Sequence, residues 1–179
     1  MTTTALLVMD VQNSVVARYP DPGYLPRLRT AVDAARAAGV RVIYPSVGFR
    51  PGAPEVDPGN RMFGRLAGLT LPASDATEIH ADVTPADGDI VVTKRRVSAF
   101  AGSDLDMVLR AQGIRQLVLT GIATSGVVLS TLRQAADLDY TLTVLADACL
   151  DSDPEVHRVL TEKIFPMQAD VLTVGDWKP

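Results

Sequence analysis

Residues 116–140 constrain the fold more than any other part of the sequence. The apolar run at residues 117–119 suits a strand buried on both faces of a parallel sheet, and Gly121 follows where the backbone must turn. Apolar residues then recur at helical spacing, which predicts a helix with one face on the sheet. We expect Thr124 or Ser125 to cap this helix, and its first N–H groups to be available to an oxyanion or carboxylate.

The same alternation of apolar runs and amphipathic segments repeats along the chain. It predicts strands at residues 5–9, 40–45, 90–93, 116–120, 141–146 and 170–174, with further helices at 24–38, 104–112 and from 153 onward. Right-handed crossovers between such strands give a three-layer α/β/α sandwich with a six-stranded, mostly parallel sheet. Because 179 residues is the length of one domain, we expect a single domain over residues 1–179.

Composition narrows the class of partner. A net charge of −4 without a basic block argues against nucleic acid, and no apolar run approaches the roughly 18 residues that span a membrane. The expected partner is a small molecule or a second copy of the chain. Residues 46–89 show no strong period apart from short helical turns expected at 60–66 and 76–80. A segment of this length usually contributes a lid, a pocket wall or a subunit interface.

The amino-terminal residues pass directly into a strand pattern without a signal-like leader. The single cysteine, Cys149, cannot form an internal disulfide. Together these features predict a cytoplasmic protein. A lone cysteine in a stretch of small residues is expected to be a buried small hydrophobe rather than a nucleophile.

Two ionisable side chains stand at the carboxyl ends of predicted strands. Asp10 follows the strand at residues 5–9, Lys94 follows the strand at 90–93, and the turn at 121–126 follows the strand at 116–120. Because parallel strands end at one edge of a sheet, we expect all three to converge on one crevice. A lysine lowers the pKa of a neighbouring carboxylate whereas burial raises it, so the pair is either tuned for proton transfer or a structural ion pair.

Three blocks of sequence resemble, in order and spacing, signatures of the isochorismatase-like, or cysteine hydrolase, superfamily. They are LLVMDVQNSV at residues 6–15, VVTKRRVSAFAGSDLDMVL at 91–109 and LVLTGIATSGVVLST at 117–131, followed by DACLDSDPEVH at 147–157. The resemblance spans nearly the whole chain. It implies a Rossmann-like sheet and an Asp–Lys–Cys triad that hydrolyses amides through a thioester intermediate.

Asp10 matches the aspartate of this family and Lys94 matches its lysine. The bond between Ile122 and Ala123 matches the cis peptide that helps to shape the family's oxyanion hole. The position of the nucleophilic cysteine, counted without gaps from the turn glycine, is occupied by Val127. Since valine has no lone pair, an acyl-enzyme cannot form at this position.

Isochorismatases proper also lack the cysteine: they carry glycine there and cleave a vinyl ether, with the aspartate protonating the enol-ether carbon before water adds. The resemblance therefore predicts a hydrolase of an amide or vinyl-ether-type bond that uses Asp10 and Lys94 for acid–base chemistry. The alternative is a catalytically inactive relative that binds a small metabolite or a protein partner.

Polar and aromatic side chains near the same strand ends are predicted to contact a substrate. These are Gln12, Asn13, Tyr44, Phe49, Phe63, Ser98, Phe100 and Ser125. Arg95 and Arg96 either pair with acidic neighbours or favour an anionic ligand, and their spacing does not decide between these roles.

No cofactor or metal is predicted. Nicotinamidase-type relatives hold a metal through an aspartate and two histidines near the second strand, but residues 44–60 contain no histidine. His80 and His157 are expected to be surface or hydrogen-bonded structural residues. The long middle segment and the habit of the family predict a homodimer or a higher homo-oligomer.

Overall fold

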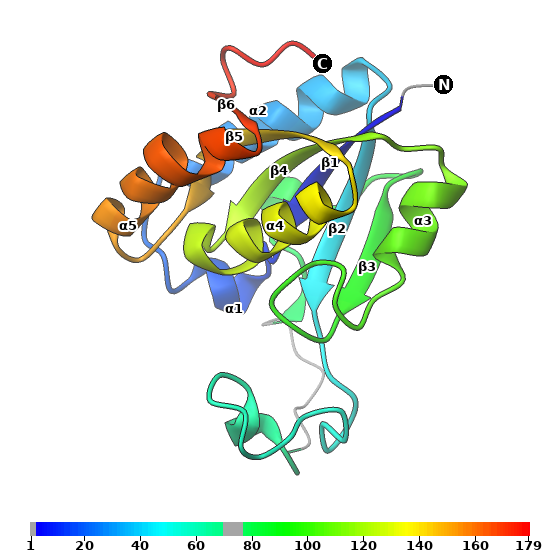
Figure 1. Cartoon of the computed structure of the whole chain (residues 1–179), viewed down its shortest axis with the longest axis vertical. Helices are drawn as coiled ribbons and strands as arrows, with labels where there is room; N and C mark the ends of the chain where they lie inside the picture. The colour runs from blue at the N-terminus through cyan, green and yellow to red at the C-terminus, as the bar shows by residue number, and fades with distance from the viewer. Residues whose placement is uncertain (1–2, 70–76) are drawn as a thin grey trace.

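The computed structural model describes residues 3–69 and 77–179. Its central element is a six-stranded sheet in the order β3-β2-β1-β4-β5-β6, and every strand pair in it is parallel (Figure 1). The sheet was predicted to be mostly parallel and is parallel throughout. Its strands are β1 (Thr4–Met9), β2 (Arg41–Val47), β3 (Ile90–Lys94), β4 (Gln116–Ile122), β5 (Thr141–Leu150) and β6 (Asp170–Leu172).

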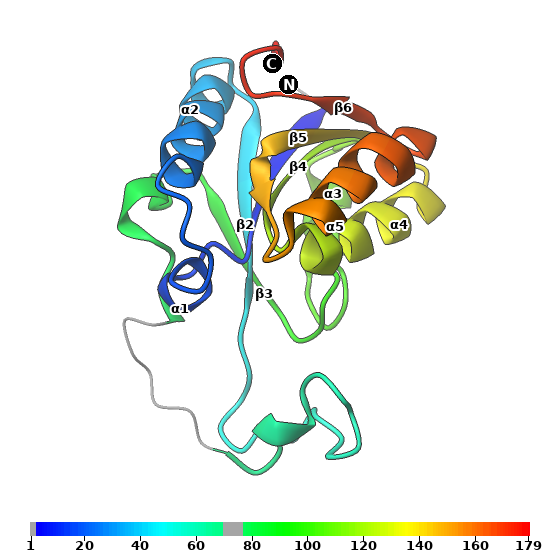
Figure 2. The same cartoon turned by 90° about the vertical axis from the view of Figure 1, so that its left-hand side faces the viewer.

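Helices cover both faces of the sheet, as the three-layer prediction required. Figure 2 shows α1 (Asn13–Val16) and α2 (Tyr24–Ala37) on one side, and α3 (Leu105–Ala111), α4 (Leu129–Asp137) and α5 (Pro154–Val159) on the other. Short 3-10 or π turns complete the helical segments: η1 (Gly64–Leu66), η3 (Ala81–Val83), η4 (Thr124–Val128), η5 (Leu160–Ile164) and η6 (Phe165–Met167). The predicted Rossmann-like α/β/α sandwich is confirmed.

Apolar periodicity explains how the layers pack. In α2, Leu28, Ala31, Val32 and Ala35 recur at helical spacing and are fully or almost fully buried against the sheet. Burial of each leucine or valine contributes about 1.5–3 kcal/mol, so this face holds the helix on the sheet. The helix stops at the predicted place because Gly39 adopts a positive φ of 70°.

The middle segment contains less regular structure. Of the turn predicted at residues 60–66, only η1 is helical. The turn predicted at 76–80 ends one residue before η3 begins, and its residue 76 lies outside the described residues. Residues 48–69, which we call the arm, project beyond the carboxyl end of β2 (Figures 1 and 2). Within the described ranges, no helix has the length and hydrophobicity needed to cross a membrane.

A close approach of two backbones fixes the end of β4. Gly121 pairs with Met9 of β1 and adopts a φ of 135°, and a Cβ placed on it would lie 2.2 Å from the Met9 carbonyl oxygen. The neighbour is backbone and cannot move aside as a flexible side chain would. Only glycine therefore fits where β4 enters the turn.

We predict that Gly121→Ala lowers the free energy of unfolding by roughly 2–5 kcal/mol, because strain at positive φ adds to the overlap with Met9. Urea denaturation measures the change. Gly113→Ala is the matched control, since Gly113 has a φ of 66° but open space around its Cβ position. Equal losses in the two variants would show that the close approach does not matter.

Candidate active site

Asp10 and Lys94 form a buried ion pair, as their places at strand ends predicted. Lys94 Nζ lies 2.8 Å from Asp10 Oδ2, and the exposed fractions of the two residues are 1% and 8%. Asp10 leaves β1 with a φ of 54°, a left-handed conformation that aspartate tolerates better than most residues. Its N–H donates to the carbonyl oxygen of Pro45 at 2.9 Å, which ties the strand end to β2.

The hydrogen bonds of the lysine hold its ammonium group in place. Besides contacting Asp10, Lys94 Nζ donates to the carbonyl oxygens of Arg96 at 2.9 Å and Val97 at 3.2 Å. An ammonium group has three N–H donors, so all three have partners. Asp10 Oδ1 also accepts a hydrogen bond from the N–H of Val47 at 3.1 Å. Each charged group is therefore held by the other and also by backbone groups of neighbouring segments.

Opposing effects act on the pKa of Asp10. Burial raises the pKa of this carboxyl, the charge and hydrogen bond of Lys94 lower it, and the net result is a pKa above the ordinary value. A carboxyl group whose pKa moves toward neutrality exchanges protons more readily near pH 7. The carboxyl group of Asp10 thus combines an ion-pair contact with a pKa above that of an exposed aspartate.

The turn after β4 contains the cis peptide expected from the family resemblance, between Ile122 and Ala123. The carbonyl oxygen of Ala123 accepts hydrogen bonds from the N–H groups of Gly126 at 3.1 Å and Val128 at 3.3 Å. Val127 is 2% exposed and belongs to the apolar cluster on the α3–α5 side of the sheet. Its isopropyl group is thus packed in hydrocarbon.

The prediction that Thr124 or Ser125 caps the helix is wrong. The helical segment η4 begins after Ala123, so both residues lie inside it. Thr124 Oγ1 instead lies 2.8 Å from His157 Nδ1, and the N–H of Ser125 donates to Asp151 Oδ2 at 2.7 Å. One N–H group that we expected to be available to a ligand is therefore occupied by a carboxylate of the chain itself.

Gln12 acts as a bridge between segments. Its Nε2 donates to the carbonyl oxygens of Val47 and Thr77 at 3.1 and 2.8 Å, and its Oε1 accepts from the N–H of Val47 at 3.0 Å. Because Val47 also donates to Asp10, the amide of Gln12 helps to position the backbone that holds the carboxylate. Gln12 is 3% exposed, so its observed role is structural.

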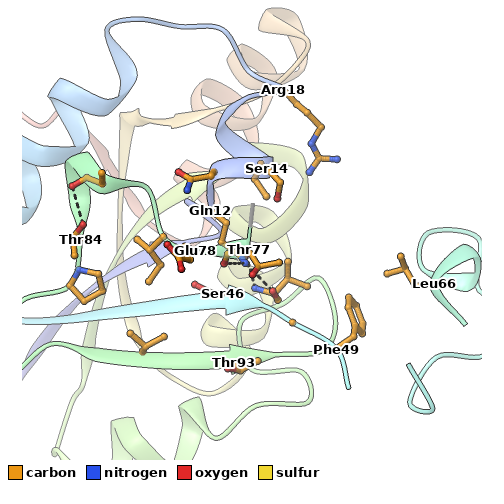
Figure 3. A pocket seen from close by; sticks show the side chains of 18 residues that line it. Gln12, Ser14, Arg18, Ser46, Phe49, Leu66, Thr77, Glu78, Thr84 and Thr93 are labelled. Carbon is orange, nitrogen blue, oxygen red and sulfur yellow. Dashed lines mark hydrogen bonds between the residues drawn. The ribbon is translucent and has the colours of Figure 1, made fainter. Parts of the chain in front are cut away.

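A cavity of about 920 Å³ lies beside this bridge, at the ends of β2 and β3 (Figure 3). Among the predicted substrate contacts it is lined by Gln12, Asn13 and Phe49, whereas Asp10 and Lys94 do not belong to its described lining. Gln12 and Val47 of this lining also belong to the hydrogen-bond network of Asp10, so the cavity and the ion pair are neighbours. Its other lining residues include Ser14, Arg18, Ser46, Leu66, Thr77, Glu78, Thr84 and Thr93.

Two of the predicted contact residues, Tyr44 and Phe100, belong to the apolar core. Tyr44 has an exposed fraction of 0% and its hydroxyl accepts a hydrogen bond from Arg36 Nη2 at 3.1 Å, because this position of β2 faces α2. Phe100 turns inward, and its ring centroid lies 6.2 Å from that of Tyr140, just before the amino end of β5. Neither ring faces the carboxyl edge of the sheet.

The remaining predicted contacts are held by neighbouring segments. Ser98 Oγ donates to Gln134 Oε1 of α4 at 2.7 Å, which attaches the loop after β3 to that helix. Phe49 lies at the start of the arm and Phe63 further along it, and their ring centroids are 5.6 Å apart. Ser125 is exposed, and its side chain as well as its N–H group hydrogen-bonds to Asp151.

Arg95 and Arg96 join the loop after β3 to the arm. Arg95 Nε forms an ion pair with Glu55 Oε1 at 3.2 Å, which is the structural role left open by the sequence. Arg96 Nη2 donates to the carbonyl oxygen of Glu55 at 2.5 Å, and its guanidinium carbon lies 5.9 Å from the ring centroid of Phe63. The arm is thus attached directly to the segment whose carbonyl groups hold Lys94.

Cys149 and the histidines have the structural settings expected of them. Cys149 is 3% exposed, its Sγ faces the carbonyl oxygen of Leu119 at 3.9 Å, and burial raises the pKa of its thiol to about 12. A thiol with this pKa is not a nucleophile at neutral pH. His80 Nδ1 accepts from the N–H of Asp82 at 3.2 Å. Residues 3–69 and 77–179 contain no group of three or more acidic, histidine or cysteine side chains arranged for a metal.

The sequence alone did not reveal the roles of Asp151 and His157. Both lie in the segment DSDPEVH, which contributed to the family resemblance and contained the start of a helix at Asp153 and Pro154, but neither signal assigned these two residues a contact. The helix start is correct, because Asp153 accepts hydrogen bonds from the N–H groups of Glu155 and Val156. Contact with the turn after β4 depends on the crossover between β4 and β5, which no local pattern encodes.

The chain is similar in sequence to known proteins along most of its length. The family model of the isochorismatase domain matches residues 4–176. The chain is 39% identical to the ureidoacrylate amidohydrolase of Stutzerimonas stutzeri over 180 residues, covering 85% of this chain and 71% of that protein. It is 36% identical to the enzyme of the same name from Caulobacter vibrioides over 206 residues, covering 98% and 90%.

Solved structures are also similar over nearly the full chain. An isochorismatase family protein from Burkholderia thailandensis superposes with a TM-score of 0.82 at 29% identity, covering 98% of this chain and 94% of that one. N-carbamoylsarcosine amidase from Thermoplasma acidophilum superposes with a TM-score of 0.77 at 26% identity, covering 99% and 100%.

We predict that Asp10→Asn and Lys94→Met each lower the free energy of unfolding by about 3–5 kcal/mol, because each leaves a buried group without its partner. The double variant should lose less than the sum of the two single losses by at least about 1 kcal/mol, since it leaves no unpaired charge. Urea denaturation of the four proteins measures this coupling. Strictly additive losses would contradict a direct interaction.

Proposed function

This chain belongs to the isochorismatase family, and on that premise we propose that it hydrolyses a small molecule with Asp10 and Lys94, without a cysteine-bound intermediate. The observation that carries the proposal is the buried pair of these residues at 2.8 Å, in which the pKa of Asp10 is raised. An acid–base group in a buried setting meets the chemical requirement for proton transfer to or from a substrate or water.

The residue at position 127 supports a mechanism without a covalent intermediate. Counted from the turn glycine, Val127 stands where the amidase members carry their nucleophilic cysteine. The buried thiol of Cys149 does not replace it, because a pKa of about 12 keeps it protonated. Water is therefore the nucleophile in our proposal.

The relatives favour cleavage of a C–N bond. Both are named for amide hydrolysis, one of a ureidoacrylate and the other of an N-carbamoyl amino acid. In the proposed reaction, ionised Asp10 takes a proton from water while the water oxygen bonds to the carbonyl carbon. The C–N bond then breaks, and the proton passes to the departing nitrogen. Lys94 keeps Asp10 oriented and partly offsets the effect of burial on its charge.

The second candidate is a catalytically silent relative that binds a metabolite or a protein partner. The observation that favours it is the packing of Val127 in the apolar cluster, which fills the nucleophile position with hydrocarbon.

A vinyl-ether substrate remains the chemical alternative within the enzymatic proposal. There Asp10 acts first as an acid and donates its proton to carbon.

We predict that the protein hydrolyses at least one member of a panel of ureido and N-carbamoyl acids, simple amides and enol ethers. Ammonia or an amine reports cleavage of the nitrogen-containing substrates, and an alcohol with a carbonyl compound reports cleavage of an enol ether. Asp10→Asn should lower kcat/KM by about 10²–10⁴-fold, the usual contribution of a general acid or base. Cys149→Ala is the control, and its activity should stay within about twofold of the parent. Circular dichroism verifies that both variants are folded at the assay temperature.

The opposite pattern, with loss in Cys149→Ala and activity in folded Asp10→Asn, would overturn the assignment. Failure of the whole panel, together with a ligand-dependent rise in melting temperature, would support the silent binder.

The pH dependence separates the two roles of Asp10. If Asp10 is a base, kcat/KM is lost as the pH falls through its pKa, and burial places that limb above the ordinary aspartate value of about 3.9. If Asp10 acts as an acid on a vinyl ether, activity is lost as the pH rises through the same pKa. Initial rates measured from acid to neutral pH show which limb is present.

We also propose that the protein assembles into a homodimer or a higher homo-oligomer. Met62 and Leu69 are large apolar residues of the arm with exposed fractions of 59% and 49%, which favours burial against another copy. Sedimentation velocity at micromolar concentration should show a species heavier than 19.1 kDa. Met62→Lys with Leu69→Lys should shift it toward the monomer, and a monomeric parent protein would refute the proposal.

A further inference from the structure

The turn after β4 is held by the segment that follows β5. Asp151, the first residue after β5, accepts from the N–H of Ser125, and His157 of α5 bonds to the hydroxyl of Thr124. Figures 1 and 2 both show α5 beside α4, the helix that continues from this turn. Two polar contacts thus connect the chain beyond β5 to two successive residues of the turn.

This turn starts next to Asp10. Gly121 of β4 is in register with Met9 of β1, so Asp10 and Ile122 leave adjacent parallel strands side by side. The cis peptide and Val127 follow within the next five residues. Any displacement of the turn would therefore change the surroundings of the proposed acid–base group.

Asp151 caps the helical segment from outside it. Its carboxylate accepts from the N–H of Ser125 near the start of η4, a segment whose helical path is interrupted at Gly126, with φ −98° and ψ −105°. Burial raises the pKa of Asp151. Hydrogen bonds from Ser125 and from backbone N–H groups together lower it by more, so the net pKa lies below the ordinary value. The carboxylate is ionised at neutral pH and occupies the position that the sequence left open for a ligand.

His157 satisfies the buried hydroxyl of Thr124. Thr124 has an exposed fraction of 0%, and a buried hydroxyl without a partner would destabilise the turn. Burial lowers the pKa of His157, and the charge of Asp151 opposes this only in part. A hydroxyl beside an imidazole can also be a nucleophile with its base, but complete burial removes Thr124 from contact with a substrate.

We infer that Asp151 and His157 are positioning residues, which fix the cis-peptide turn beside Asp10 through Ser125 and Thr124. The catalytic meaning of this inference rests on the proposed function, but the contacts themselves do not. The experiments therefore begin with measurements that need no substrate.

Amide hydrogen exchange of residues 121–128 tests the contacts. Thr124→Val removes the hydroxyl at nearly constant volume, whereas Thr124→Ser keeps it; Asp151→Ala removes the acceptor, whereas Asp151→Asn keeps an oxygen. We expect exchange to be at least about tenfold faster in the two disruptive variants and within about threefold of the parent in the two conservative ones. Unchanged exchange in folded Thr124→Val and Asp151→Ala would overturn the inference.

Histidine NMR provides a signature that general loosening would not produce. The chain has two histidines, so a His80→Gln variant identifies the ring signals of His157. In Asp151→Asn the titration midpoint of His157 should fall, because the negative charge that stabilises the imidazolium is lost. A midpoint that stays constant or rises would contradict the coupling between the two residues.

Turnover provides the third measurement, with any substrate that the parent protein hydrolyses. Thr124→Val should lower kcat with KM nearly unchanged, and Thr124→Ser should restore it; a change in KM alone would contradict a positioning role. If the parent protein hydrolyses no member of the panel, the proposed function fails, while exchange and NMR still decide whether the two residues hold the turn.

Discussion

The buried contact between Asp10 and Lys94 is the interaction on which the rest of the site depends. Removing two charges from water is unfavourable unless their remaining hydrogen-bonding groups are also satisfied. Here the carbonyl groups of Arg96 and Val97 complete the ammonium shell, and the N–H of Val47 binds the carboxylate. The loop after β3 and the end of β2 are therefore shaped to complete this one contact.

The topology of the sheet brings the pair together. β2 lies between β1 and β3, so the two charged residues meet across the end of β2 and not along one strand pair. The amide of Gln12 holds Val47 from the other side, and Arg96 extends the same network into the arm. The surroundings of Lys94 are thus linked to the arm, which we propose to contact another copy of the chain.

Our proposal that Val127 stands at the position of the family's thiol is compatible in physical terms with membership of the isochorismatase family. The close approach of Gly121 to Met9 involves atoms of β4 and β1 and not the side chain at position 127. A valine there packs into the apolar cluster without disturbing the buried ion pair. The backbone frame and the buried ion pair are therefore both present with a valine at position 127, as our proposal of water as the nucleophile requires.

The sequence by itself determined the layered α/β fold and the meeting of Asp10 with Lys94, because apolar periodicity defines strands and helices, and parallel strands end at one edge. The cis peptide followed from family resemblance and not from any local preference of Ile122 and Ala123. Only the tertiary structure decided that Tyr44 and Phe100 face the core, since the direction of a side chain depends on which face of the sheet is covered. It alone also brought Asp151 and His157 to the turn after β4, because contacts between residues about 30 positions apart arise from the packing of adjacent strands and helices.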